Sequence, residues 1–287
     1  MISSALIGRR RPVSGPAASA ISISTDRLPA DRRPTRRRMK IALLVVGGMV
    51  AFTGCGGGGS KAQPQASATA IPDPVRSQLA AVTAVNADGM NTIVTAAGAV
   101  VDIYKSPTAK TASSQLHSPN PAGAPRVFLV VAKLPNWWHV LLPVEPNGST
   151  GWVKASQVKA SLTGYHIVVA RKDHRLRVYD KTTIVVDEPI AVGTTDTPTP
   201  GGHFYVTELL QPRNPAGAYG PYAFGLSGFS TTLDSFDGED PVIGIHGTNQ
   251  PNLVGQDVSH GCIRVRNDVI TRLAKILPLG TPVEIAA

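Results

Sequence analysis

Short apolar runs separated by turn residues fill the chain from about residue 92 to its end. In the first part of this region the runs are AVVDIY, RVFLVVA, WWHVLLPV and GWVKASQV, which are rich in β-branched and aromatic residues. Runs of this kind are typical of strands. Proline, asparagine and glycine break the pattern at 119–121 and 145–148, as they do in turns. The pattern therefore predicts a small all-β barrel or sandwich over residues 91–162.

A second series of apolar runs predicts another β-rich unit over residues 164–287. YHIVVA and RLRVYD flank a polar turn at 171–174 like the strands of a hairpin, and TIVVDEPIAVG, HFYVTELL and VIGIHG continue the series. The last of these is a short apolar strand that ends near His246. The stretch 211–241 is rich in Gly, Pro, Ser and Tyr without periodicity. So long a loop is usually functional, and we expect it to form a lid.

One short helix is predicted near the C-terminus. Val269, Leu273, Ile276 and Leu277 fall at helical spacing, and the Asn-Asp pair at 267–268 is suited to cap the first turn. A proline and a glycine soon afterwards end the helix, and TPVEIA is expected to form a closing strand. The fold class predicted for the whole chain is therefore mostly β, with one or two short helices.

The tryptophans of the first β unit carry a resemblance of their own. The run WWHV at 137–140, followed by GWV at 151–153, resembles bacterial SH3-like barrels, which often bind cell-wall peptides. Neighbouring side chains of a strand point to opposite faces, so we expect one of Trp137 and Trp138 near the surface or a domain interface. Filling a small core is an equally good explanation for Trp152.

The N-terminal segment looks like an export signal. Residues 39–55 read MKIALLVVGGMVAFTGC, in which an uncharged apolar stretch follows a basic flank that includes Lys40 and then ends in small residues. This is the anatomy of a secretory signal peptide, and the stretch is short for a membrane span. The ending resembles the cleavage box of bacterial lipoproteins, which implies a diacylated Cys55 as the mature N-terminus. The alternative is an uncleaved membrane anchor in which Cys55 has no role.

Residues 1–54 are accordingly assigned to a leader and signal peptide, and 55–90 to a linker. The linker is rich in Gly, Ala, Pro, Ser and Gln and has no apolar periodicity, which is typical of a flexible tether.

The positive charge of the chain belongs to this leader. The formal net charge is +9 with a pI near 9.8, and residues 1–40 hold ten basic and two acidic residues. Residues 41–54 are uncharged, so the part from Cys55 onward carries only about +1. That excess is too small for an electrostatic nucleic-acid interface, and we expect no nucleic-acid partner.

The candidate chemistry lies in the segment HGTNQPNLVGQDVSHGCIRV, residues 246–265. The chain has two cysteines, so lipidation of Cys55 leaves Cys262 without an intrachain disulfide partner and potentially reactive. A thiol attacks carbonyls as thiolate and needs a nearby base. His260 shares a face with Cys262 if the stretch is extended. His246 arrives from a separate strand end and is the better placed general base.

Gly261 allows close approach of a substrate, and the amides of Gly261 and Cys262 are natural oxyanion donors. Two alternatives compete with catalysis. His203, His246, His260 and Cys262 are possible zinc ligands, but the recurrent spacings of metal motifs are missing. A buried structural cysteine is the other alternative, and the two His-Gly pairs nearby disfavour it.

The residues around His246 and Cys262 resemble the signature of a known family. His246, a spacer, and then Ser-His-Gly-Cys at 259–262 followed by Ile-Arg match the signature of L,D-transpeptidases with a YkuD-type catalytic domain. TPTPGGHFYV and AYGPYAFGLSGFS resemble the family's strand and substrate loop, and the match spans about residues 164–286. In papain-type cysteine peptidases the Cys precedes the His, which argues against that rival. The resemblance implies a β-rich sandwich with a long lid over residues 164–287.

The resemblance also implies roles for individual residues. Cys262 is expected to be the nucleophile and His246 its base, oriented by the backbone carbonyl of Gly247. His260 is expected to support the thiolate or the shape of the site. Ser259 is expected to hold the loop by hydrogen bonding, and Arg264 to order the site or attract a peptide carboxylate. Tyr219 and Tyr222 are candidates for a lid tyrosine that assists the oxyanion. Asn249 and Gln250 are candidates to line the pocket, although they could equally cap a turn.

The function implied is peptidoglycan remodelling at the outer face of the cytoplasmic membrane, to which a lipid would anchor the protein. Cys262 would attack the third-position diamino acid of a stem tetrapeptide, release D-alanine and pass the acyl group to an amine of a neighbouring stem. No cofactor is needed, and carbapenem-type β-lactams are expected covalent inhibitors. The alternatives are an L,D-carboxypeptidase, in which water resolves the thioester, and a non-catalytic wall-binding lipoprotein.

Overall fold

The computed structural model describes residues 21–23, 88–235 and 240–286. These belong to one compact unit of the chain and contain eighteen strands and a single α-helix. The prediction of a mostly β protein is therefore confirmed. The predicted signal peptide, Cys55 and nearly all of the tether lie outside the described residues. Strand β1 (Ile21–Ile23) pairs in parallel with β13.

The first lobe, residues 91–163, is built on a five-stranded antiparallel sheet of order β7-β6-β5-β2-β8. Alternating apolar positions of these strands form a small core that includes Val94, Phe128 and Val140. Together with a two-stranded sheet and a 3₁₀ turn, its elements are β2 (Asn91–Ala96), β3 (Val100–Ile103), β4 (Ser114–His117), β5 (Val127–Leu134), β6 (Trp137–Leu141), β7 (Thr150–Lys154), η2 (Ala155–Gln157) and β8 (Val158–Thr163).

The tryptophans of this lobe separate as the strand geometry requires. Trp138 packs against the main core of the lobe, whereas Trp137 packs on the other side against the cluster that contains Tyr104 and Trp152. Trp152 is buried, which fits a core role, and Trp137 and Trp138 are both half-buried. The SH3-like resemblance itself stays a prediction.

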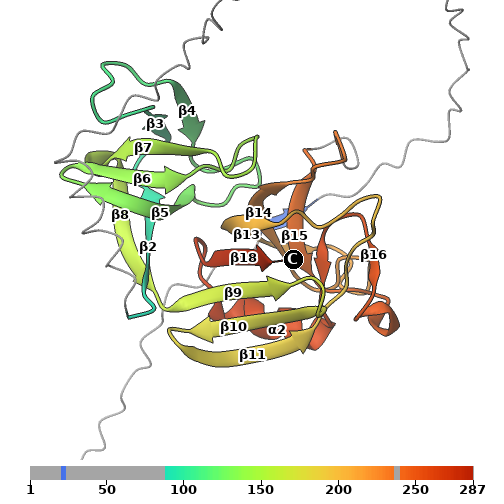
Figure 1. Cartoon of the computed structure of the whole chain (residues 1–287). Helices are drawn as coiled ribbons and strands as arrows, with labels where there is room; N and C mark the ends of the chain where they lie inside the picture. The colour runs from blue at the N-terminus through green and yellow to red at the C-terminus, as the bar shows by residue number, and fades with distance from the viewer. Residues whose placement is uncertain (1–20, 24–87, 236–239, 287) are drawn as a thin grey trace, which may run out of the picture. The chain divides into compact units, whose positions relative to one another are not determined.

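The second lobe contains a long mixed sheet of order β11-β10-β9-β18-β13-β14-β15-β17 (Figure 1). The predicted hairpin is confirmed, because β9 and β10 pair antiparallel around the turn at 171–174. The elements are β9 (Tyr165–Ala170), β10 (Arg175–Asp180), β11 (Thr183–Pro189), β12 (Val192–Gly193), β13 (Gly202–Pro212), β14 (Ala223–Phe229), β15 (Val242–His246), η3 (Pro251–Leu253), β16 (Asp257–Ser259), β17 (Ile263–Arg264), α2 (Asn267–Ile276) and β18 (Pro282–Ala286).

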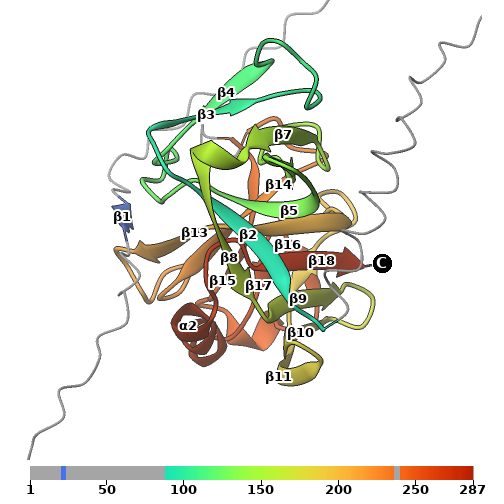
Figure 2. The same cartoon turned by 90° about the vertical axis from the view of Figure 1, so that its left-hand side faces the viewer.

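The two ends of this sheet come together. Ala191, just after β11 at one end, exchanges two backbone hydrogen bonds of 2.9 Å with Arg264 in β17 at the other end. Helix α2 contacts β15, and its Arg272 donates to the backbone of β11 at Val185. The sheet must therefore curl, because the same helix and the same β-bridge reach both of its ends (Figures 1 and 2).

Helix α2 occupies the predicted place but starts differently from the prediction. Val269, Ile270 and Leu273 are its buried residues, as the apolar spacing requires. The residue before the first turn is Arg266, and no side chain caps the helix. Instead of capping, the Asn267 side chain accepts a hydrogen bond of 2.8 Å from the Thr248 amide. The polar residue at the helix start thus holds the chain that follows His246.

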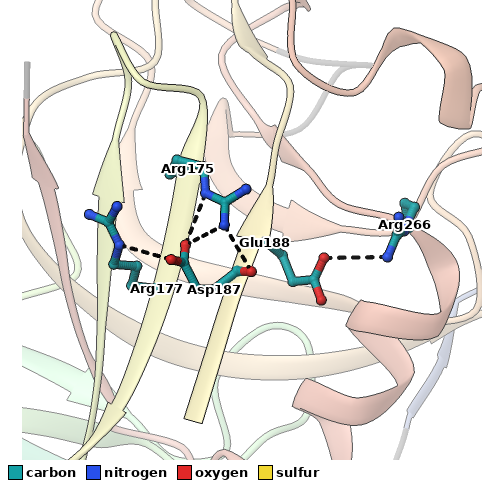
Figure 3. A network of polar contacts seen from close by, with 5 residues as sticks. All are labelled: Arg175, Arg177, Asp187, Glu188 and Arg266. Atoms are coloured by element: carbon teal, nitrogen blue, oxygen red, sulfur yellow. Dashed lines mark hydrogen bonds and ion pairs between the residues drawn. The ribbon is translucent and has the colours of Figure 1, made fainter. Parts of the chain in front are cut away.

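Ion pairs tie the outer strands to this helix on the surface (Figure 3). Asp187 on β11 accepts from Arg175 and Arg177 on β10, and Glu188 accepts from Arg266 at 3.3 Å. Although desolvation opposes the change, the two arginines lower the pKa of Asp187. Exposed pairs of this kind contribute little individually to the free energy of unfolding.

The two lobes are joined through β13 and the end of β14. Strand β5 packs beside β13 (Figure 2). Asn147 exchanges two hydrogen bonds of 2.8 Å with the backbone of Phe229, and Asn120 donates to Glu208 at 2.7 Å. An apolar cluster of Val127, Leu141 and Tyr205 fills the junction. Tyr205 is fully buried, and its hydroxyl has no hydrogen-bond partner among the described residues.

Replacing this hydroxyl should not destabilise the protein. We expect Tyr205→Phe to keep or raise the free energy of unfolding by up to about 1 kcal/mol, because a buried unsatisfied hydroxyl is costly. Tyr179→Phe, at a half-buried ring stacked on His166, is the matched control and should change stability little. Urea denaturation measures both. A loss of more than about 1 kcal/mol in Tyr205→Phe would mean that the hydroxyl is hydrogen-bonded in solution.

Candidate active site

A cavity of about 290 Å³ opens where β15, β17 and the chain before β14 meet. His246, Cys262 and Arg264 line it together with Ser259 and His260. The other lining residues come from the start of β15 and from the loops beside it: Ala218, Tyr219, Ser230, Leu233, Pro241, Val242 and Ile243. Five of the sequence-predicted site residues at 246–264 thus share one cavity with Tyr219.

Parallel pairing of β15 with β17 brings the histidine and the cysteine together. Ile245 faces Ile263 and His246 faces Arg264 in this register. Cys262, one residue before β17, therefore lies beside Gly244, whose amide donates to Sγ at 3.4 Å. A side chain at position 244 would place its Cβ only 2.9 Å from the Phe224 carbonyl oxygen. Glycine here thus permits the close approach of β14 to β15.

The histidine ring is fixed in one orientation. His246 is buried, with 5% of its surface exposed, and its Nδ1 lies 2.6 Å from the Gly247 carbonyl oxygen. A carbonyl only accepts, so Nδ1 carries the proton and Nε2 keeps its lone pair. Burial lowers the pKa of His246 to about 4, against the hydrogen bond to Gly247 and with help from Arg264. The imidazole is therefore neutral at pH 7 and able to accept a proton.

The thiol is neutral as well. Cys262 is half-buried, and burial raises its pKa, although the Gly244 amide and the charge of Arg264 act in the opposite direction. By staying neutral, the partly desolvated thiol and the buried imidazole each avoid the cost of an isolated charge. Both shifts favour the neutral forms, so the resting pair is thiol and imidazole.

The loop that carries Cys262 is held from both sides. Ser259 is buried, donates from Oγ to the Cys262 carbonyl oxygen and accepts from the Gly261 amide at 3.1 Å. On the outer side, the Thr194 amide and the Thr197 hydroxyl both donate to the Ser259 carbonyl oxygen. Gly261 has φ +113, a conformation that suits glycine. Because its amide is already bonded to Ser259, the expected role of Gly261 as an oxyanion donor does not hold in this conformation.

Tyr219 and Tyr222, both predicted as lid tyrosines, occupy different surroundings. Tyr219 lines the cavity, and its ring centroid lies 4.8 Å from that of His246 at an angle of 55°. Tyr222 packs instead against the core of the second lobe and does not line the cavity. The geometry brings Tyr219 to the site and not Tyr222.

The sequence of this chain is similar to those of known proteins. The L,D-transpeptidase catalytic domain family YkuD matches residues 164–285. The YkuD protein of Bacillus licheniformis, assigned to the L,D-transpeptidases, is 37% identical over 154 residues, which cover 51% of this chain and 85% of that protein. The chain belongs to the L,D-transpeptidase family. The YkuD protein of Bacillus subtilis is 39% identical over 121 residues, covering 42% of this chain and 65% of that protein.

Among solved structures, the catalytic domain of the L,D-transpeptidase from E. faecium is similar to this chain. The identity is 23% and the TM-score 0.31, and the alignment covers 42% of this chain and 96% of that domain. Membership of the L,D-transpeptidase family implies a cysteine-dependent acyltransferase, and Cys262 is the cysteine among the described residues.

Other residues predicted for the site lie away from the cavity. Asn249 and Gln250 are exposed and do not line it, because the chain turns outward after the buried Thr248. His203, considered as a fourth zinc ligand, is exposed on β13. Within the described ranges, no group of three or more His, Cys, Asp or Glu is placed to hold a metal ion.

Three residues that organise the site were missed in the sequence. Gly244 interrupts an apolar strand, which is a sign of close backbone approach. Asn267 carried a signal that suited a helix cap equally well, and Thr197 begins the motif TPTPGGHFYV, which gave it no role of its own. Asn267 also explains two glycines, since a Cβ at Gly220 or Gly247 would meet its Oδ1 at 2.3 Å. The Tyr219 loop and the end of β15 can therefore approach each other closely.

In the part of the chain that the structure describes, no helix is long and apolar enough to cross a membrane.

The charge state of Cys262 can be tested by alkylation. In a Cys55→Ala protein, we expect Cys262 to react with iodoacetamide more slowly at neutral pH than glutathione does. The rate of alkylation should still increase at pH values above about 8.5, the ordinary pKa of a thiol. The reason is that only the thiolate reacts and the pKa of Cys262 is raised. Mass spectrometry of the alkylated protein over a pH series gives the rates. A rate that levels off below about pH 7 would mean a thiolate–imidazolium pair instead.

Proposed function

We propose that the chain is a peptidoglycan L,D-transpeptidase whose nucleophile is Cys262 and whose base is His246. The observation that supports this most is the parallel pairing of β15 with β17, which places both residues in one cavity with Nε2 available as acceptor. Family membership supplies the reaction class. The third-position diamino acid of a stem tetrapeptide is the proposed donor.

In the first half of the reaction, His246 Nε2 takes the thiol proton as Sγ attacks the donor carbonyl. The tetrahedral intermediate collapses to a thioester when the C–N bond to D-alanine breaks and His246 returns the proton to the leaving amine. A neutral histidine suits this role because it must accept a proton and then give it back. The Gly244 amide nitrogen lies 3.4 Å from Sγ and stabilises negative charge on the sulfur.

In the second half, an amine of a neighbouring stem attacks the thioester and gives its proton to His246. The C–S bond breaks, the thiolate recovers that proton, and a cross-link between two third-position residues remains. Arg264 borders the cavity with a half-buried side chain, and its Nε has no hydrogen-bond partner among the described residues. It is suited to hold a peptide carboxylate, as proposed from the sequence.

Two alternatives differ in the fate of the acyl group. An L,D-carboxypeptidase would use water and yield only tripeptide. A non-catalytic wall-binding lipoprotein would bind purified sacculi without changing their cross-links, and the half-buried Trp137 and Trp138 of the first lobe are suited to such contacts. Lipidation of Cys55, which anchors the protein at the outer face of the cytoplasmic membrane, completes the proposal.

Covalent labelling tests the nucleophile. We expect a carbapenem to add its mass once to the wild-type protein and to Cys55→Ala, and not to Cys262→Ala. The β-lactam carbonyl acylates the thiol in the same way as a donor peptide would. Intact-protein mass spectrometry measures the adduct. An adduct that persists in Cys262→Ala, or none on the wild type, would contradict the assignment.

Replacing His246 should lower the product yield of a muropeptide assay with a tetrapeptide donor more than replacing His260 does. Loss of a general base typically costs 10²- to 10⁴-fold, so His246→Ala should lower the combined yield of dimer and tripeptide by at least about 100-fold. His260→Ala should cost less than about tenfold, because His260 is exposed at the rim of the cavity. Chromatography of the products separates dimer from tripeptide and so also distinguishes transfer from hydrolysis. Equal losses in both variants would refute the distinction between base and support.

A further inference from the structure

A second, larger cavity of about 600 Å³ lies between the two lobes. From the first lobe, Asn120, Ala122 and Arg126 line it, and from the second lobe Glu208, Phe229 and Val242 do so. Its size falls in the range of ligand sites, roughly 300 to 1,000 Å³, and its wall combines apolar and charged groups as such sites do. None of these residues except Val242 belongs to the candidate active site.

Charged residues of both signs border this cavity: Arg126, Glu208 and the exposed Asp240. Arg126 is 9% exposed, and within the described residues its guanidinium makes one hydrogen bond, from Nε to the His117 carbonyl oxygen at 3.0 Å. Among the residues that the structure describes, Glu208 receives only the Asn120 amide, on Oε2. No ion pair joins Arg126 to Glu208 in the described ranges, although each feels the charge of the other.

The two groups are not equally buried. Arg126 is buried and Glu208 is half-buried, and a buried guanidinium normally pairs with a carboxylate. The Nη groups of Arg126 and Oε1 of Glu208 therefore remain able to bind a ligand. A carboxylate suits Arg126, and an amide or ammonium N–H suits Glu208.

The two cavities are neighbours along the chain and in space. Val242, at the start of β15, lines both of them. At the end of β14, Phe229 lines the interlobe cavity and the next residue, Ser230, lines the active-site cavity. The active-site cavity, at about 290 Å³, offers space for one acyl chain. A second, amine-bearing substrate needs a place of its own beside it.

We propose that the interlobe cavity is the subsite for the acceptor stem peptide. The acceptor carboxylate binds Arg126, a peptide N–H donates to Glu208, and the reacting amine passes over Val242 to the Cys262 thioester. This assignment rests on the proposed transpeptidase function and adds the position of the second substrate. It also gives the first lobe a part in the reaction, because Arg126 belongs to that lobe.

The test compares transfer with acylation in the full-length protein. Arg126→Gln removes the carboxylate-binding group, and Ala122→Trp fills the cavity without removing a polar contact. Lys159→Gln and Ala160→Trp make the same changes on exposed positions of β8 and are the matched controls. With a tetrapeptide donor, we expect the ratio of dimer to tripeptide to fall about tenfold in the first pair only, the loss typical of one charge-assisted hydrogen bond. Carbapenem acylation should stay within about twofold in all four variants.

The outcomes distinguish the two proposals. A dimer-to-tripeptide ratio equal to that of the controls, with acylation intact, would overturn the subsite and leave the transpeptidase standing. Absence of a carbapenem adduct on wild type would overturn the proposed function instead. The subsite is then judged by calorimetry on Cys262→Ala protein with a stem tetrapeptide as probe. Affinity should drop about tenfold on adding Arg126→Gln, and unchanged or undetectable binding counts against the subsite. Thermal unfolding of each variant verifies its fold.

Discussion

The parallel pairing of β15 with β17 is the constraint on which the candidate site depends. Only two residue pairs make this ladder, Ile245 with Ile263 and His246 with Arg264, and both isoleucines are fully buried. A slip of one residue would turn Ile263 away from the core. The burial of these apolar side chains therefore fixes where His246 and Cys262 stand relative to each other.

Burial that fixes the geometry also sets the electrostatics. The same desolvation lowers the pKa of His246 and raises that of Cys262, so the resting site holds two neutral groups. Backbone groups replace an acidic third residue, because the Gly247 carbonyl orients the imidazole and the Gly244 amide contacts the sulfur. The site thus combines a dry environment with dipoles that are already oriented, which suits charge that appears only during reaction.

Support for the site comes from segments far apart in the chain. Asn267 at the start of α2 holds Thr248 after His246, and Thr194 and Thr197 hold the loop at Ser259. The bridge between Ala191 and Arg264 closes the curled sheet around this loop. Across the lobe junction, Asn147 and Asn120 tie the first lobe to the end of β14 and to β13. The unpaired charges of Arg126 and Glu208 lie at this same junction, which is why we assign it a ligand.

The sequence by itself determined the mostly β class, the hairpin around 171–174, the C-terminal helix and the set of residues around Cys262. Alternating apolar runs and helical spacing are local signals, and the His-Gly and Ser-His-Gly-Cys segments carry their chemistry in the order of residues. Only the tertiary structure decided which tyrosine reaches the cavity, that Gly261 gives its amide to Ser259, and that Asn267 holds a strand end instead of a cap. It also brought Arg126 and Glu208 to one cavity. These outcomes depend on which backbone groups are already paired when distant segments meet, and no local pattern encodes that.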